Sequence, residues 1–472
     1  MATDNDLVKA FKAIKTKRPK LDLLESYVEG GQPLRYSTER LEEAFRDIRA
    51  RFEINWCSVI VSTTLDRLQL TGFDVGNSKG KGGLLTWIKN IFRKKPVDKA
   101  TAQAANDMLD AIFDELHIDL EADKAHKAAL SMESAFVIVW KTTEGDMQVY
   151  FNDPRLIHIF YESDNPRKKR YAAKWFRRDD DRHEITLYYI DKIEHWASKS
   201  TREDIGNPND FGLESTEPNT FGIIPVFELK TEGEIVKVTS LQDAINKTFA
   251  DMMVSNEFGS WAQRWVIANA DPGDLKNGPN QIWWIPSGDG VGQSASVGQF
   301  TSTPPGGFLD SMDKLASYMF TITRTPKHYL INTGANISGE ALLAMEAPLT
   351  KKVERHQNKF EAGWQDIGAF MLHLMGVEVL PSAITTTWKR VESIQPLTEA
   401  QTMQTAVNTG IPLETFLRRQ GWTEVEIQEL RDDQKREQTA RRTMAQSVLD
   451  NLRVQNEQDN TSPVTGESAV RQ

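Results

Sequence analysis

The sequence predicts an α+β protein, with a mixed helical and strand region followed by a mostly helical second half. Residues 1–238 contain apolar stripes of helical period and then five short runs that are rich in β-branched or aromatic residues and bounded by turn residues. After residue 238 helical patterns dominate, and a Pro/Gly-rich island at 271–305 interrupts them. At 472 residues the chain is long enough to form two or more packed domains.

The first region begins with helical patterns and continues with strands. A helix is predicted over 41–68, and one or two more over 99–132. The apolar positions that carry the first pattern are Phe45, Ile48, Phe52, Trp56 and Val59. Strands are then predicted at 134–143, 146–153, 156–163, 170–178 and 183–192.

Three features of this region have alternative interpretations. Asp179–Asp181 offers three carboxylates to a metal ion, but flanking arginines and strands favour a hairpin turn. Pro166–Arg170 is most simply a solvated turn, with nucleic-acid contact as the alternative. The single cysteine, Cys57, lies in an apolar run and is predicted to be a buried structural thiol rather than a reactive one.

The second region predicts a helical hairpin with a compact tip. One helix is predicted over 239–270, about 45 Å long, with Asp243, Lys247 and Asp251 along a polar stripe. A second helix begins at residue 306 and ends before Pro326. Its apolar stripe consists of Leu309, Met312, Leu315, Met319 and Ile322. The island between the two helices contains strand candidates at 281–286 and 296–300.

A short loop, INTGANIS (331–338), precedes a long amphipathic helix. Ser338 is a suitable N-cap for a helix whose apolar stripe reaches Gly376, and Pro348 is expected to kink it. Lys351, Arg355 and Lys359 form a basic face at i, i+4 steps. Further helices are predicted after Thr387 to about residue 455, and the tail at 456–472 is predicted to be disordered.

Composition and motifs give no sign of catalysis. The net charge of −10 argues against tight wrapping of nucleic acid, but not against nucleic acid that slides past. The chain shows no signal-peptide pattern and no apolar run long enough for a membrane span. Gly76–Gly83 is the best P-loop candidate, yet it has the wrong spacing and lacks the hydroxyl residue after Lys81. No metal-ligand spacing or nucleophile elbow is present, so we expect no enzyme, cofactor or metal site.

The order of segments resembles that of the portal proteins, or head-to-tail connectors, of tailed double-stranded DNA bacteriophages, of the siphophage type. The resemblance covers about residues 20–400. It is carried by YVEGGQPL (27–34), EINWCSVIVSTTLDRLQLTGF (53–73), SAFVIVW (134–140), NDPRLIHIFYE (152–162), FGIIPVFEL (221–229), TPKHYL (325–330) and SGEALLAMEAPLTKKVERHQNKF (338–360).

The resemblance implies a portal fold. Its parts are a mixed α/β wing at 1–238, stem helices at 239–270 and 306–330 around a small β clip at 271–305, a tunnel loop at 331–338, a long kinked wing helix with a following strand at 339–390, crown helices at 391–455, and the tail at 456–472. Such proteins form dodecameric rings at one capsid vertex. Terminase drives DNA through the ring during packaging, and the DNA leaves through it at ejection.

The same resemblance implies partners and contact residues. Expected partners are other copies of the chain, double-stranded DNA, the terminase large subunit, an adaptor or head-completion protein, and the major capsid and scaffolding proteins. No membrane partner is expected. The expected locations are the portal vertex of the virion and, during assembly, the cytoplasm of the bacterial host.

Residues are assigned to three kinds of contact. The DNA-facing residues of the tunnel loop are Asn332, Thr333, Gly334, Asn336, Ile337 and Ser338. Lys351, Arg355 and Lys359 are candidates for contact with DNA or a neighbouring subunit, and Lys276, Trp283 and Trp284 of the clip for contact with an adaptor, terminase or a subunit. Two other classes of protein function remain as alternatives. One is a non-portal virion scaffold or helical interaction protein, and the other is a nucleotide-dependent enzyme using 76–83 or 331–338.

Overall fold

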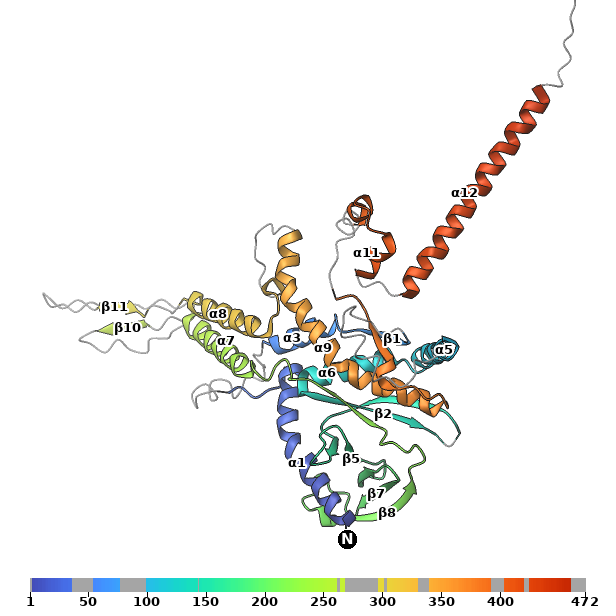
Figure 1. Ribbon diagram of the computed structural model, residues 1–472. Coiled ribbons are helices and arrows are strands. Elements are labelled where there is room, and N and C mark those ends of the chain that lie inside the picture. The colour runs from blue at the N-terminus through green and yellow to red at the C-terminus, as the bar shows by residue number, and fades with distance from the viewer. Residues whose placement is uncertain are drawn as a thin grey trace, which may run out of the picture. The chain divides into compact units, whose positions relative to one another are not determined.

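A computed structural model describes residues 2–35, 54–76, 99–142, 144–260, 264–267, 296–300, 304–329, 339–391, 403–419 and 424–459 (Figure 1). The chain divides into two compact units, residues 1–391 and 392–472. The predicted mixture of helices and sheets is confirmed. Within the described residues, no helix is both long and apolar enough to cross a membrane.

The first unit contains most of the regular structure. Its helices are α1 (Ala2–Glu29), α3 (Trp56–Leu65), α5 (Lys99–Glu115), α6 (Ile118–Met132), α7 (Thr239–Ser260), α8 (Gly306–Thr323) and α9 (Gly339–Leu374), with 3-10 turns at Pro208–Asp210, Lys327–Tyr329 and Pro381–Ala383. Its strands are β1 (Leu70–Val75), β2 (Ser134–Lys141), β3 (Met147–Asn152), β4 (Ile157–Tyr161), β5 (Lys169–Arg177), β6 (His183–Tyr188), β7 (Lys192–Ser198), β8 (Phe211–Pro218), β9 (Val226–Lys230), β10 (Arg264–Ile267), β11 (Ser296–Gln299) and β12 (Ile384–Trp388).

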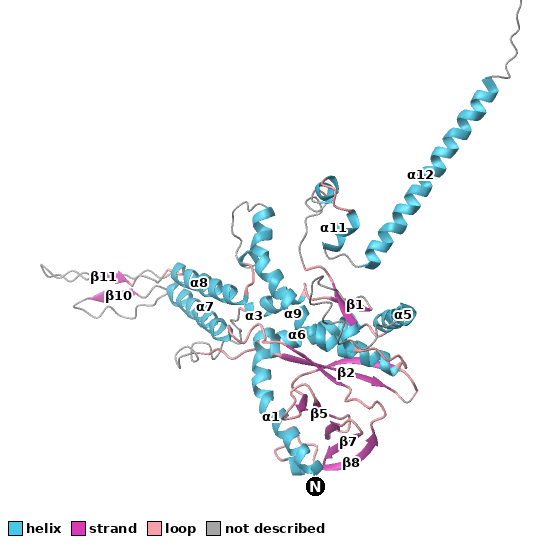
Figure 2. Cartoon of the chain, viewed as in Figure 1, coloured by secondary structure: helices cyan, strands magenta, loops and turns pink. Residues whose placement is uncertain are grey.

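Two antiparallel sheets pack face to face beside α1 (Figure 2). The larger sheet has the order β4-β5-β6-β7-β8, and the smaller has the order β3-β2-β9. α1 covers the outer face of the larger sheet, where Phe11 stacks on Trp175 with 4.8 Å between ring centroids. On the inner face Tyr188 packs in one cluster with Phe136 and Ile138 of β2.

The central strand β2 is buried on both faces, because it lies between two hydrophobic clusters. Successive side chains of a strand point to opposite sides, so alternate residues of β2 enter different clusters. Phe136 and Ile138 face the larger sheet, whereas Val137 and Val139 belong to the main core of the unit. That core also takes side chains from α3, α5, α6, α8 and α9 and from the two-stranded sheet β1-β12. The smaller sheet thus joins the larger sheet to the helices.

The helices α7 and α8 lie side by side, with the β10-β11 ribbon beyond their joined ends (Figure 1). The helix predicted over 239–270 was too long, because α7 ends at Ser260 and Arg264–Ile267 pairs antiparallel with Ser296–Gln299. The run RWVI is aromatic and β-branched, which favours a strand once a partner is available. The Trp265 ring also covers Gly298 so closely that a side chain there would clash. At 22 residues α7 is about 33 Å long.

The long amphipathic helix predicted after the loop is α9, which spans 36 residues and contains Pro348. Figure 1 shows its first turns running in a different direction from the remainder. The chain then turns at Gly376, whose φ of 84° lies in the left-handed region that favours glycine, and returns as β12.

The second unit is small and helical. It contains α11 (Leu413–Arg419) and α12 (Glu424–Asp459), with a small core of Ala406, Phe416, Leu417 and Ile427. Of the tail predicted to be disordered, residues 456–459 are helical because α12 continues to Asp459, and 460–472 lie outside the described residues. Ion pairs one helical turn apart, such as Glu437 with Arg441 at 2.6 Å, support this polar helix.

Several local predictions are confirmed. Cys57 is fully buried, and burial raises the pKa of its thiol to about 12. Asp179–Asp181 forms the β5-β6 turn, where Arg182 pairs with Asp180 at 2.7 Å and Arg177 with Asp181 at 3.1 Å.

Candidate functional site

Most of the predicted contact residues lie outside the described part of the chain. This applies to Lys276, Trp283 and Trp284 of the clip and to Asn332, Thr333, Gly334, Asn336, Ile337 and Ser338 of the loop. The same holds for 77–83 of the P-loop candidate. The elements that flank the clip and the loop are described, however, and so is the predicted basic face of α9.

The basic face of α9 is partly neutralised by nearby acids. Lys351 pairs with Glu354 at 2.8 Å on the exposed side of the helix. Lys359 pairs at 3.1 Å with Glu232, in the segment between β9 and α7. Arg355 is exposed, and within the described residues no ion pair or hydrogen bond of its side chain is found. The sequence pattern showed three cations spaced four residues apart, but it did not show that Glu232 pairs with Lys359.

A buried ion cluster lies on the other side of α9, where sequence reasoning did not expect one. Lys352 and His356 both contact the Glu234 carboxylate, at 2.8 Å and 2.7 Å. These three side chains are only 8%, 6% and 9% exposed, in the order Lys352, His356, Glu234. His356 also lies 3.1 Å from the Thr231 hydroxyl. The cluster ties α9 to the segment that leads into α7.

Burial and the neighbouring groups of this cluster shift the pKa values of Glu234 and Lys352. Burial alone would raise the pKa of Glu234, but the hydrogen bond with His356 and the charge of Lys352 outweigh it and lower that pKa below 4.5. Burial lowers the pKa of Lys352, and Glu234 offsets part of that effect. The signal in the sequence was the i, i+4 spacing of Lys352 and His356 beside the apolar Val353 and Phe360, which places both on the buried face.

The first turns of α7 are fixed by buried polar contacts. The Tyr27 hydroxyl donates to the Asp243 carboxylate, 2.7 Å and 2.8 Å from its two oxygens. The side-chain amide oxygen of Gln242, Oε1, accepts from the backbone N–H groups of Trp56 and Cys57 at 3.0 Å and 3.3 Å. Asp243, the first residue of the predicted polar stripe, is therefore buried. Lys247 and Asp251 do form the expected pair.

A histidine supports α9 from inside the core. The Trp364 indole N–H donates to His126 Nε2 at 2.9 Å, and the Nδ1 of His126 lies 3.1 Å from the Leu68 carbonyl oxygen. Because Nε2 accepts, the ring proton is placed on Nδ1 and donates to Leu68. Burial lowers the pKa of His126 to about 3, so the ring is neutral and structural.

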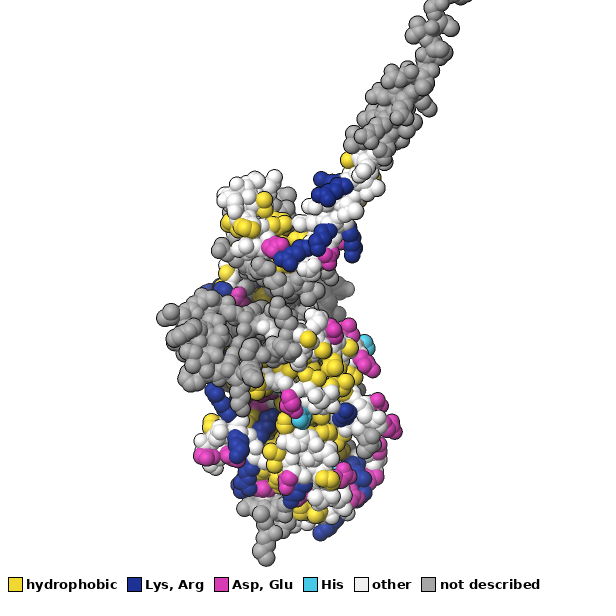
Figure 3. Space-filling view, turned by 45° about the vertical axis from the view of Figure 1, so that its right-hand side comes forward, with side chains coloured by type: hydrophobic (Ala, Val, Ile, Leu, Met, Phe, Trp, Pro, Cys, Tyr) yellow, Lys and Arg dark blue, Asp and Glu magenta, His cyan; other side chains and the backbone are white. Residues whose placement is uncertain are grey.

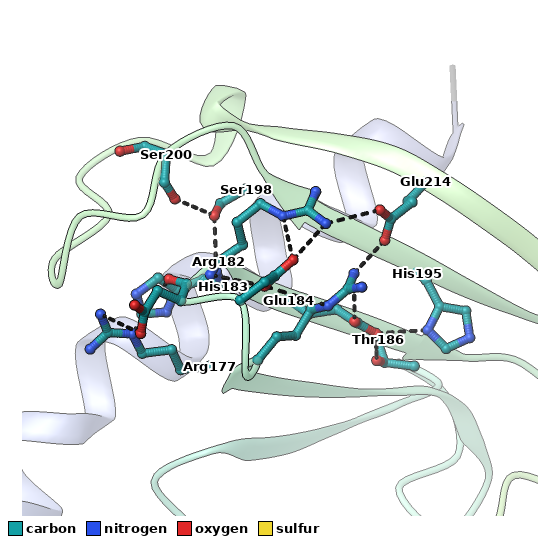
Figure 4. Close-up of polar contacts among 12 residues, drawn as sticks. Arg177, Arg182, His183, Glu184, Thr186, His195, Ser198, Ser200 and Glu214 are labelled. Atoms are coloured by element: carbon teal, nitrogen blue, oxygen red, sulfur yellow. Dashed lines mark hydrogen bonds and ion pairs between the residues drawn. The ribbon is translucent and has the colours of Figure 1, made fainter.

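A polar pocket of about 670 Å³ lies at the end of the larger sheet (Figure 4). Its lining is formed by Phe176, Arg177, Arg178, Asp179, Asp180, Glu184, His195, Glu214, Ser215 and Glu217. Glu184 lies near its centre, 2.7 Å from His195 Nδ1 and 2.8 Å from the Thr186 hydroxyl. The hydrogen bond with Glu184 raises the pKa of His195, with burial opposing it. Arg178 pairs with Glu184 and Glu214, which links three strands at this end of the sheet.

The described surface is mixed in charge and carries an apolar face on α8. Positive and negative side chains are interspersed over the visible face (Figure 3). On α8, Met312 and Met319 of the predicted stripe are buried, but Leu309 and Ile322 are 48% and 51% exposed. Tyr318, one turn from Ile322, is 60% exposed. The helix therefore has a second apolar face beside the buried one.

Comparison with known proteins identifies the family. The family described as "Phage portal protein, SPP1 Gp6-like" matches residues 13–440. Because the match spans most of the chain, the chain belongs to this family of phage portal proteins. A "Portal protein" of Mycobacterium phage D29 is 28% identical over 142 residues, which cover 29% of this chain and 29% of that protein. The chain thus matches less than a third of the length of this curated relative.

Proposed function

We propose that the protein forms the portal ring at one vertex of a tailed-phage capsid. The ring would be the channel through which terminase packages double-stranded DNA and through which the DNA is later ejected. The observation that carries this proposal is the family match over residues 13–440. The proposed role is structural, with no reaction or cofactor.

The α7-α8 pair supports the proposed assembly of copies into a closed ring, for which we propose about twelve copies from the family. One face of α8 packs against α7 in the same chain, while Tyr318 and Ile322 remain exposed on the next face. An apolar face next to a buried one is covered when a neighbouring copy packs against it. Head-to-tail contacts of this kind close into rings when the rotation between copies permits. In this proposal α7 and α8 are the stem, and the second unit contributes the crown.

The segment 331–338 is proposed as the tunnel loop that touches passing DNA. Asn332, Thr333, Asn336 and Ser338 can exchange hydrogen bonds with phosphates, and none carries a fixed positive charge. Weak, exchangeable contacts suit a conduit through which a motor moves DNA. Of the basic face on α9, Arg355 is the best candidate for contact with DNA or a neighbouring subunit, because Lys351 and Lys359 already pair with acids.

The clip at 271–305 is proposed as the docking platform for terminase and for the adaptor or head-completion protein. Trp283 and Trp284 are neighbours in a strand-like run, so in a strand they would point to opposite faces. One tryptophan could then pack within the clip while the other contacts a partner, where tryptophan is a frequent hot spot. Lys276 offers a positive charge to the same partner.

The test of the proposed function is DNA packaging into capsids assembled with variant protein. Removing two residues from 331–338, or the substitution Asn336→Asp, should leave ring assembly intact and lower the amount or length of DNA packaged. Asn336→Gln is the matched control, since it keeps the amide. Normal packaging by both altered loops would mean that this segment is only a connection between α8 and α9.

A further inference from the structure

One guanidinium joins three segments that are far apart in the sequence. Arg67, which follows α3, contacts Glu346 of α9 at 3.0 Å through Nη2. The same nitrogen donates to the Tyr329 hydroxyl at 2.8 Å, and Nη1 lies 3.5 Å from the carbonyl oxygen of Val391. The Tyr329 hydroxyl in turn donates to Glu346 at 2.9 Å. Arg67, Tyr329 and Glu346 therefore form a closed triangle of polar contacts.

The two charged corners of the triangle are largely shielded from water, whereas Tyr329 is 39% exposed. The side chains of Arg67 and Glu346 are 13% and 14% exposed. His328 Nε2 lies 3.6 Å from Glu346, and the buried Nδ1 of His328 has no hydrogen-bond partner among the described residues. A charge in such a place is strongly destabilising once its partner is lost, because water cannot replace that partner. The arrangement of the chain around this triangle thus depends on both the Arg67 guanidinium and the Glu346 carboxylate.

The position of the triangle in the chain gives it a role beyond packing. Tyr329 ends the 3-10 turn just before residues 330–338, and Glu346 lies in the early turns of α9 just after them. Val391 is the last residue of the first unit, where the chain continues into 392–472. Arg67 therefore contacts the chain on both sides of the proposed DNA-contacting segment, and it also contacts the last residue before the second unit.

We propose that Arg67, Tyr329 and Glu346 form a positioning junction. The junction fixes the chain on both sides of residues 330–338 and couples its position to that of Val391, the last residue of the first unit. The proposal rests on the proposed portal function only for its effect on DNA. The junction is a property of the protomer and can be tested without DNA. Arginine is required because its planar fork contacts several acceptors at once, whereas lysine offers a single point charge.

The first test uses hydrogen exchange on the purified full-length protein. Arg67→Met and Glu346→Gln should each speed exchange about tenfold in three segments together, namely 327–329, 343–347 and 389–391. In the double variant these segments should exchange no faster than in the single variant with the faster exchange, because the double variant leaves no uncompensated charge. The matched control is Lys351→Met, which breaks an exposed pair on the same helix. Faster exchange confined to the segment that carries the substitution would overturn the junction.

The second test separates the junction from the portal function. With wild-type protein packaging DNA normally, Arg67→Lys should form rings and melt near the wild-type temperature, yet package less or shorter DNA. Lys124→Met, which breaks an exposed pair with Glu121 on α6, should package normally. If exchange changes as predicted but packaging does not, the junction exists and does not position a DNA-contacting segment. If the wild-type protein itself neither forms rings nor packages DNA, the proposed function fails and the exchange result still stands.

Discussion

The substitution Lys352→Met should destabilise the protein far more than the same substitution at the neighbouring Lys351. Lys352 is 8% exposed, and its ammonium lies 2.8 Å from Glu234. Removing one partner of a buried ion pair costs about 3–5 kcal/mol. His356 remains hydrogen-bonded to Glu234, so we expect the lower end, about 3 kcal/mol of unfolding free energy. Lys351 is 72% exposed, and loss of its pair with Glu354 should cost less than about 0.5 kcal/mol.

The measurement is urea unfolding followed by tryptophan fluorescence, at one fixed protomer concentration because assembly adds concentration-dependent stability. Lys352→Met with Glu234→Gln should recover part of the loss, since the double variant buries no unpaired charge. Equal effects of Lys351→Met and Lys352→Met would refute the idea that the buried cluster fixes α9. A double variant that loses the full sum of the single effects would refute the coupling.

Three further predictions follow from the same structure. Hydrogen bonding to Glu184 raises the pKa of His195 above 6.5, and the pKa of Glu184 is lowered. This pair therefore stabilises the fold fully between the lowered pKa of Glu184 and pH 6.5, and it loses its effect as the pH rises through the raised pKa of His195. His195→Gln should flatten the dependence of the melting temperature on pH above 6.5, and an unchanged slope would contradict this. Tyr27→Phe leaves buried Asp243 without its hydroxyl donor and should cost about 2 kcal/mol in urea unfolding, whereas Tyr318→Phe should be neutral. Tyr318→Ser with Ile322→Ser should preserve the protomer's circular dichroism but reduce ring formation in sedimentation velocity, and undiminished rings would remove this face from the interface.

The sequence predicted those elements whose side chains show a clear period. The strands β2 to β6 alternate or are continuously apolar, and all of them were expected at their places. β8 was not expected, because its residues after Phe211 are polar and exposed and it forms by pairing with β7. The long helix α1 was missed although Leu7, Phe11, Ile14, Leu21 and Leu24 follow one stripe, since Pro19 and a run of lysines interrupt it.

The charged contacts were harder to predict than the elements. Lys351, Lys352 and Lys359 look alike in the sequence, and only the fold shows that Glu232 and Glu234 meet two of them. Arg67 and Glu346 are 279 residues apart, and no local pattern links them. Ion pairs across such distances depend on tertiary packing, so sequence periodicity can identify the faces of α9 but not the partners of its charges.

The central claim is that this chain assembles into a portal ring, and electron microscopy of the purified full-length protein tests it most directly. End-on class averages should show closed rings with a central channel and about twelvefold symmetry. Particles that remain monomers or dimers at every protein concentration and salt condition would contradict the account.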